Sequence, residues 1–363
     1  MSVLQYAKRS VTLLAAVSMV LTGCGDSSPD VPFNPAGTSA DMEAVGAAFG
    51  SSAFVSFSSL SYLFDAVYTG APLVSSSVAA LDLRARGAGG MRAGAIRSAK
   101  QLARILSAGR NTTLSASRSA IPAGIAGKTY EYSGGAYVPT DRTGAPSNGV
   151  RFLLYAVDPV TLQPVLPLVE TGYVDITDLS GTTTESARLQ VVSGTTTYVD
   201  YTVVANSVAG RISVIGFVTD GSQQANLNVV ATISGTGAVT LVYGLDVPQR
   251  DVSIDLRLAA SGSDIQNGVF DIILSMNGPN GTVSLSGQFT ATGATLTVRT
   301  GGATFATITV TGSADPVITG ANGQPITDQD AAALQAIFEL TADAFGAFGQ
   351  LVAPVSFFLQ PAA

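Results

Sequence analysis

Hydrophobic and polar residues alternate along most of the chain between residues 149 and 310. The alternation is clearest over 252–258, 283–289 and 295–299, where apolar residues interleave with Ser, Thr, Asp, Arg or Gln. Successive side chains of a β-strand point to opposite faces, so a period of two predicts strands with one buried and one solvated face.

Short turn signals separate these segments, which are about eight to eleven residues long. The signals are Asn148-Gly149, Ser193-Gly194, Asp220-Gly221, Gly235-Thr236-Gly237, Ser261-Gly262-Ser263, the Asn-Gly-Pro-Asn-Gly run 277–281 and Thr300-Gly301-Gly302. Short turns join antiparallel neighbours. The pattern therefore predicts an up-and-down antiparallel meander of roughly ten to fourteen strands over 128–326.

Two details of this meander are predicted separately. A hairpin with a Gly134-Gly135 turn is expected at its start, after residue 128. The connection 158–167 contains three prolines and is expected to be a surface loop.

Before the meander, a period of three to four residues predicts helix in the Gly-, Ala- and Arg-rich segment 38–127. The first helix is expected over 40–64, with Thr38 or Ser39 as its cap. Gly46 and Gly50 lower its helix propensity. Further helices are expected over 73–83 and 91–106. The apolar stripe of the first helix is Met42, Val45, Phe49, Phe57, Leu60 and Phe64.

After the meander, a last helix is expected within 327–363, followed by an apolar tail. Thr327 and Asp330 have the spacing of a capping box at its start. Its apolar stripe is Leu334, Ile337, Phe338, Phe345, Phe348 and Val352. Pro354 is expected to end this helix.

The sequence thus predicts a mainly β fold with flanking α-helices. A long meander exposes an apolar face unless something covers it, and the N- and C-terminal amphipathic helices are the available cover. Two architectures satisfy this requirement: a half-barrel closed by the helices, or a complete barrel with helices at one end. The aromatic residues of the helices are interpreted as core and also as candidate lining of a ligand cavity. They are Phe49, Phe57, Phe338, Phe345 and Phe348.

The N-terminus has the features of an export signal. Lys8 and Arg9 precede the apolar run 11–21, which is too short to cross a bilayer. The run ends in Leu21-Thr22-Gly23-Cys24, which resembles the lipobox of bacterial lipoproteins. The alternative is a secreted protein with a spare thiol.

The resemblance implies that residues 1–23 are a signal peptide and that Cys24 carries a diacylglycerol, usually with a third acyl chain on the new N-terminus. Two or three acyl chains hold a protein on a membrane where one does not. Residues 24–37 are polar and Pro-containing, and are expected to form a tether. Among lipoproteins, Asp after the cysteine favours the inner membrane. Gly25 at that position therefore favours the outer membrane.

The amino-acid composition excludes several kinds of catalytic and metal site. The chain contains no His and one Cys, which excludes a Ser-His-Asp triad, a Cys-His pair, His-based zinc sites and an internal disulfide. No cofactor is expected apart from the covalent lipid. The net charge is −7, although residues 83–130 carry nine Lys or Arg and no Asp or Glu. That stretch is interpreted as a solvated linker, with attraction to anionic head groups as the alternative. Nucleic acid is not an expected partner of an exported protein.

One short pattern recurs. Residues 173–177 and 198–202 both read Tyr-Val-Asp-x-Thr, which places Tyr, Asp and Thr on one strand face. The simplest interpretation is two exposed strand faces of similar composition, and the alternative is a polar ligand track or a calcium ligand pair.

The function expected from these features is that of a membrane-anchored extracytoplasmic lipoprotein, not an enzyme, that binds an apolar or amphipathic ligand between sheet and helices. One alternative is a structural or adhesive cell-surface module. Others are a transmembrane β-barrel and a glycan hydrolase that uses two carboxylates. The oligomeric state is left open.

Overall fold

The structure is a computed structural model. It describes residues 32–69, 119–158, 161, 163–182, 184–206, 208–234, 238–261, 269–290, 292–311, 317–334, 336–337 and 351. All of them belong to one compact unit, Pro32–Ala363. Several predicted features lie outside the described residues: the signal peptide and lipobox, the tether up to residue 31, the helices at 73–83 and 91–106, and Phe338, Phe345 and Phe348.

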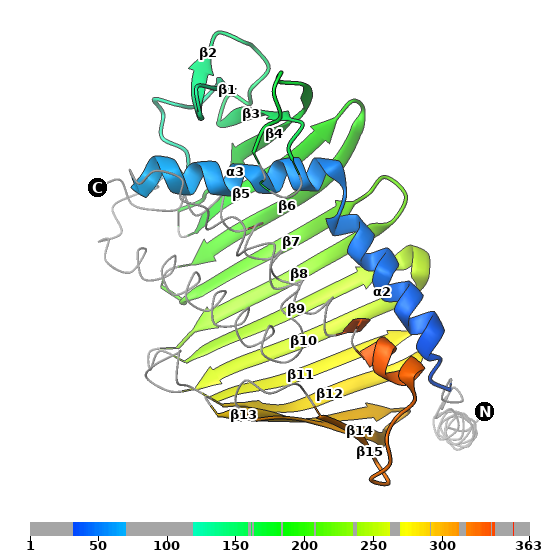
Figure 1. The fold of residues 1–363 in the computed structure, drawn as a ribbon. Coiled ribbons are helices and arrows are strands. Elements are labelled where there is room, and N and C mark those ends of the chain that lie inside the picture. The colour runs from blue at the N-terminus through cyan, green and yellow to red at the C-terminus, as the bar shows by residue number, and fades with distance from the viewer. Residues whose placement is uncertain are drawn as a thin grey trace, which may run out of the picture. The chain divides into compact units, whose positions relative to one another are not determined.

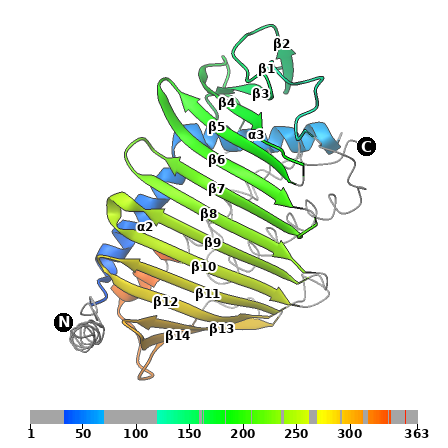
Figure 2. The same cartoon turned by 180° about the vertical axis from the view of Figure 1, so that it is seen from behind.

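One sheet of 15 strands dominates the described residues (Figures 1 and 2). From β3 to β15 each strand pairs with its neighbours in the chain, as predicted for a meander. The sheet is open and does not close into a barrel, because β2 and β15 form its two edges. The strands are β1 (Lys128–Ser133), β2 (Ala136–Thr140), β3 (Gly149–Tyr155), β4 (Glu170–Asp178), β5 (Glu185–Ser193), β6 (Thr196–Asn206), β7 (Arg211–Thr219), β8 (Gln224–Ile233), β9 (Val239–Val247), β10 (Val252–Ser261), β11 (Val269–Gly278), β12 (Gly281–Phe289), β13 (Gly293–Thr300), β14 (Ala303–Thr311) and β15 (Val317–Gly320).

The first hairpin departs from the simple meander. β1 and β2 pair through the predicted turn, where Gly134 and Gly135 both have positive φ (62° and 92°). A two-residue turn of this kind requires positive φ at both positions, which glycine adopts without steric cost. β1 then pairs in parallel with β3, from Lys128 opposite Val150 to Tyr130 opposite Phe152. The hairpin therefore extends the sheet beyond β3, which the turn pattern did not reveal.

Both edges of the sheet are poor templates for further strands. β2 contains Pro139, which has no N–H to donate, and β15 has only four residues. Edge strands of this kind discourage edge-to-edge association. The short β15 also raises the number of strands above the roughly ten to fourteen that the turn signals suggest.

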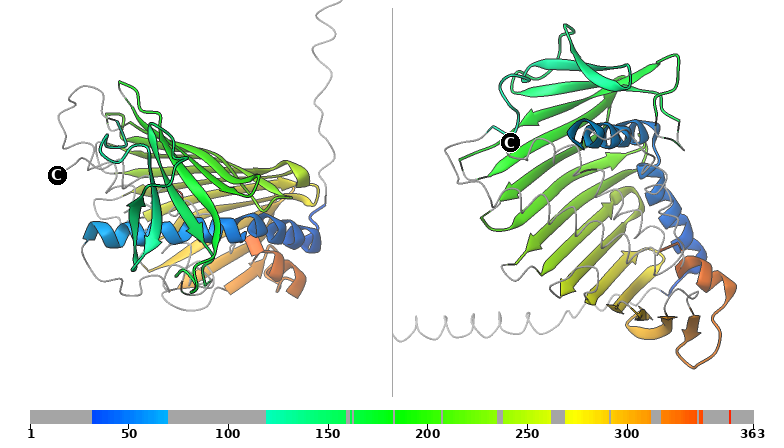
Figure 3. Two further views of the ribbon diagram at one scale, coloured as in Figure 1. Left: turned by 90° about the horizontal axis from the view of Figure 1, so that it is seen from above. Right: turned by 60° about the vertical axis from the view of Figure 1, so that its left-hand side comes forward.

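The predicted alternation is confirmed along the strands. In β9 the buried positions alternate with half-buried or exposed ones, and β10 and β11 continue the same pattern in register. Two helices, α2 (Pro35–Phe49) and α3 (Ser52–Thr69), cross one face of the sheet, called here the covered face (Figure 1). The opposite, uncovered face carries neither of these helices (Figure 2), and the sheet twists along its length (Figure 3).

The first helix differs from its prediction in two ways. Its N-cap is Asn34, whose side chain accepts a hydrogen bond from the N–H of Gly37, and Pro35 occupies the first turn. The cap predicted at Thr38 or Ser39 is therefore wrong, because an Asn-Pro start lies one turn earlier and proline is pre-organised for that position. The helix therefore begins at Pro35, inside the segment 24–37 that was predicted to be a tether.

The single helix expected over 40–64 is two helices. Gly50 ends α2, and its N–H donates to the carbonyl oxygens of Gly46 and Ala47. Ser51 then accepts a hydrogen bond from the N–H of Phe54 and so supports a new start. Glycine followed by a capping serine separates the two helices although the apolar period continues.

The start of the last helix agrees with its prediction. Residues 328–334 and 336–337 are helical. Thr327 Oγ1 accepts from the N–H of Asp330, while Asp330 Oδ2 accepts from the N–H of Thr327 at 3.3 Å. These reciprocal bonds are those of a capping box. Leu334 and Ile337 are buried in the same core as the sheet.

A polar clip, made by Asn34, Asp41, Arg250 and Asn280, fixes the start of α2 to the sheet. The N–H of Asn34 donates to the carbonyl oxygen of Asn280, in the turn between β11 and β12. Asn280 Nδ2 donates to Asp41 Oδ2 at 2.7 Å, and Arg250 Nη1 lies 3.5 Å from Asp41 Oδ1. The side chain of Asp41 is only 6% exposed, so these partners replace the water that it loses.

We expect Asp41→Ala to destabilise the protein by about 1–3 kcal/mol, because it leaves the Asn280 amide and the Arg250 guanidinium without their acceptor. Urea unfolding followed by circular dichroism measures this change. Asp255→Ala is the matched control: Asp255 is exposed on the uncovered face, and its loss is expected to change stability by less than about 0.5 kcal/mol. Equal effects of the two substitutions would contradict a role for the clip.

Candidate functional site: the covered face of the sheet

The covered face is a continuous apolar surface from β3 to β14. Each strand contributes alternate Val, Leu, Ile, Ala, Met or aromatic side chains, and these residues form one buried cluster together with residues of α2 and α3. Apolar contacts of this kind are non-directional, and their strength follows the area removed from water. Helices on such a face are held mainly by burial and not by hydrogen bonds to the strands.

The predicted lining residues that the structure describes are packed into this cluster. Phe57 is fully buried, and its ring centroid lies 6.0 Å from that of Phe54 and 6.3 Å from that of Tyr201. Phe49 is partly buried and contacts Phe54 edge to face, with ring centroids 5.7 Å apart. Both residues serve as core, as predicted. Their further role as ligand lining remains a prediction, and Phe338, Phe345 and Phe348 lie outside the described residues.

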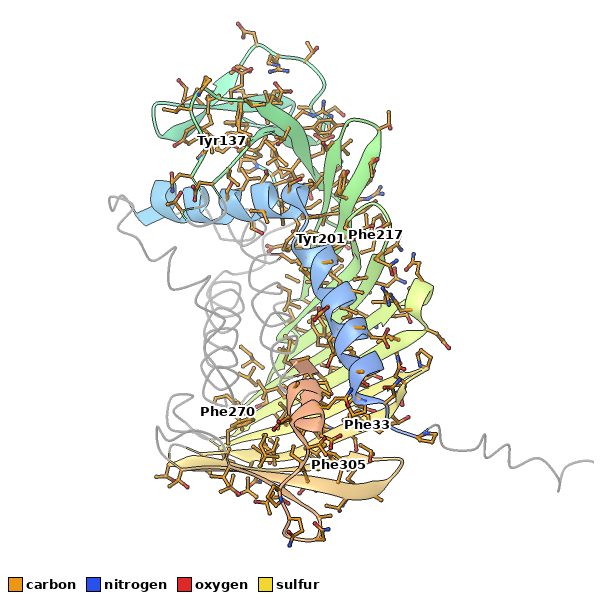
Figure 4. All side chains as sticks on the ribbon, turned by 45° about the vertical axis from the view of Figure 1, so that its right-hand side comes forward. Phe33, Tyr137, Tyr201, Phe217, Phe270 and Phe305 are labelled. Carbon is orange, nitrogen blue, oxygen red and sulfur yellow. The ribbon has the colours of Figure 1, made fainter. Side chains whose placement is uncertain are left out.

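Tyr201, on β6, is a polar point on the covered face that the sequence pattern did not single out (Figure 4). Its hydroxyl donates to the carbonyl oxygen of Leu351 at 2.6 Å, which joins the sheet to the C-terminal part of the chain. Tyr201 is opposite Gly216 on β7, where a Cβ would lie 2.5 Å from the Cβ of Tyr201. Burial raises the pKa of the Tyr201 hydroxyl well above its ordinary value.

Tyr243 is a second buried tyrosine, near the middle of β9. It is 1% exposed, and its hydroxyl forms no hydrogen bond with any residue that the structure describes. Burial raises its pKa, because the phenolate would lose its hydration. A buried hydroxyl without a partner costs about 1–3 kcal/mol relative to one that is hydrogen-bonded. Tyr at an inward-facing position of an alternating strand was the sequence signal that could have identified both residues.

The Tyr, Asp and Thr residues of the repeated Tyr-Val-Asp-x-Thr pattern lie on the uncovered face, in β4 and β6. Arg151 donates to both carboxylate oxygens of Asp175 at 2.7 Å and lies over the ring of Tyr173. Arg188 likewise donates to both oxygens of Asp200, at 2.8 and 2.6 Å. Each carboxylate is thus engaged by an arginine on a neighbouring strand, as cross-strand pairs on an exposed face are. Within the described residues, no group of three or more His, Cys, Asp or Glu side chains is placed to hold a metal ion.

Two carboxylates also meet at the β2 end of the sheet. Arg142 Nη1 lies 3.2 Å from Glu131 Oε1 and 2.9 Å from Glu170 Oε2. The three side chains are between 32% and 50% exposed. An arginine placed between two partly exposed acids resembles a surface ion-pair network, whereas a glycan hydrolase needs one of its two acids to donate a proton.

No family model matches the chain, and neither a curated protein nor a solved structure matches it significantly. The helices that the structure describes include none with the length and apolar character needed to cross a membrane.

The two buried tyrosines predict an alkaline loss of stability. Below pH 10 both are protonated whether the chain is folded or unfolded. Above the ordinary pKa of 10.0 they ionise only in the unfolded chain, so each removes up to about 1.4 kcal/mol of stability per pH unit. We expect the free energy of unfolding to fall less steeply above pH 10 in Tyr201→Phe/Tyr243→Phe than in the wild type. Urea unfolding at pH 8, 10 and 11 measures the two slopes, and identical slopes would contradict neutral, buried hydroxyls.

Proposed function

We propose that the protein is an extracytoplasmic lipoprotein, anchored by lipid on Cys24, that binds an apolar or amphipathic ligand between its sheet and its helices. In a cell with two membranes, the outer membrane is its proposed location. The activity is proposed to be binding and not catalysis.

The anchor rests on the sequence: a basic start, a short apolar run and Leu21-Thr22-Gly23-Cys24. The first residue that the structure describes is Pro32, and α2 begins at Pro35. Asn34 lies ten residues after Cys24, and a fully extended chain over ten residue steps reaches about 33–36 Å. This reach is enough for the folded unit to stand clear of lipid head groups.

The proposal of ligand binding rests on one observation. The covered face is an apolar surface that extends over many strands, whereas the helices on it are attached largely by apolar burial. The buried cluster spans strands from β3 to β14. Among the described residues, the polar contacts between helices and sheet include the clip at the start of α2 and the bond from Tyr201 to Leu351. An acyl chain offers the strands the same non-directional contacts that the helices offer, and the strand-to-strand hydrogen bonds do not have to change when it enters.

One observation favours the second candidate, a structural or adhesive module. Large apolar side chains are exposed on the uncovered face, among them Ile215 (59%), Ile273 (52%) and Val242 (43%). Val242 and Ile273 both flank Arg257 of β10 in the register of the sheet. Exposed apolar side chains among polar ones are a feature of protein-binding surfaces, although β-branched residues are also common on open strands.

Replacing the lipobox cysteine tests the anchor. Cys24→Ser is expected to abolish the incorporation of an alkyne-labelled palmitate and to move the protein from the membrane fraction to the soluble extracytoplasmic fraction. Gly25→Asp keeps the acceptor thiol, and we expect it to retain the label but to shift the protein towards the inner membrane. Membrane association that persists in Cys24→Ser would disprove a sole lipid anchor.

Extraction tests the ligand. We expect residues 24–363 carrying Cys24→Ser, purified from cells without detergent, to release about one lipid-like molecule per protein into organic solvent, identified by mass spectrometry. Ile215→Ser alters only the uncovered face and is expected to retain that molecule. If no apolar molecule is extracted, and an added naphthylamine dye shows no binding, the second candidate is favoured instead.

A further inference from the structure

A buried tyrosine hydroxyl in the middle of the covered face has no hydrogen-bond partner among the described residues. It belongs to Tyr243 of β9, which is 1% exposed. The strands place it among apolar side chains: Val229 and Leu256 lie opposite it on β8 and β10, and Leu241 and Leu245 flank it on β9. A buried hydroxyl in such surroundings is unfavourable unless another molecule supplies its partner.

Tyr201 is a buried tyrosine whose hydroxyl does have a hydrogen-bond partner within the chain. It lies on the same face, and its hydroxyl donates to the carbonyl oxygen of Leu351 at 2.6 Å. Phenylalanine would fill the space of Tyr243 without the cost of an unpaired hydroxyl. The two hydroxyls therefore differ in whether a described oxygen of the protein accepts their hydrogen bond.

We propose that Tyr243 is the polar contact of the ligand site, where its hydroxyl donates a hydrogen bond to an uncharged oxygen of a long-chain amphiphile. This inference rests on the proposed function and adds to it a residue and a ligand class. The ligand oxygen belongs to a hydroxyl or an ester carbonyl, with the acyl or alkyl chain lying along the apolar side chains of the neighbouring strands.

The charge distribution of the sheet explains why the ligand oxygen is uncharged. Charged residues in the middle of the strands alternate to the uncovered face, as Asp255 and Arg257 do on β10. A carboxylate or phosphate beside Tyr243 would be buried without a cation on the neighbouring strands, which is far more costly than burying a hydroxyl or an ester.

Tyr243→Phe removes the proposed contact and keeps the ring. The experiment uses residues 24–363 with Cys24→Ser, stripped of bound lipid, and measures competition of two probes with a naphthylamine dye. The probes are 1-hexadecanol, which has the oxygen, and 1-chlorohexadecane, which lacks it. We expect Tyr243→Phe to weaken hexadecanol binding by about 3- to 10-fold and to leave chlorohexadecane binding unchanged.

Tyr201→Phe is the matched control, and thermal unfolding without ligand is the second measurement. Tyr201→Phe is expected to lower the melting temperature because it removes a bond within the protein, whereas Tyr243→Phe is expected to keep or raise it.

Three results would overturn the proposal. If both probes bind the wild type and Tyr243→Phe weakens them equally or not at all, the role of Tyr243 is wrong while the proposed function stands. If Tyr243→Phe lowers the melting temperature as much as Tyr201→Phe does, its hydroxyl has a partner within the protein. If neither probe binds the wild type, the proposed function fails and the role of Tyr243 fails with it.

Discussion

The pairing of each strand with its neighbours in the chain is the constraint on which the rest of the structure depends. From β3 to β15 the register runs without a crossover, so the alternation along each strand becomes a row of side chains across the sheet. Every second residue then joins one apolar face much wider than any single strand. Such a face is unstable in water, and the helices before and after the meander are what the chain has available to cover it.

The way this cover is attached differs from the way the sheet is built. Strands are joined by backbone hydrogen bonds at nearly every position, whereas α2 and α3 meet the sheet mainly through apolar side chains. Among the residues that the structure describes, the directional contacts between cover and sheet include the polar clip around Asp41 and the bond from Tyr201 to Leu351. A rigid sheet beneath a cover that is held by burial is the physical basis for proposing a ligand between them. The unpaired hydroxyl of Tyr243 gives that site a polar point.

Sequence reasoning succeeded where one local signal controlled the outcome. The Gly134-Gly135 hairpin, the Thr327–Asp330 capping box and the alternation of β9 and β10 all appear as predicted. It failed where two local signals competed. The apolar period continued through Gly50, but the glycine and the Ser51 cap divided the helix, and Asn34-Pro35 started it earlier than Thr38. The parallel pairing of β1 with β3 has no local signal, because it joins segments that no short turn connects.

By itself, the sequence determined the strand period, the absence of histidine chemistry and the resemblance to a lipoprotein signal at Cys24, because each depends on residue type and spacing within a short window. Only the tertiary structure decided that the sheet stays open, that Asp175 and Asp200 are engaged by arginines, and that Tyr201 is satisfied while Tyr243 is not. These outcomes depend on which strands and chain segments become neighbours. Hydrogen bonding and burial are properties of those neighbours, and the one-dimensional pattern does not contain them.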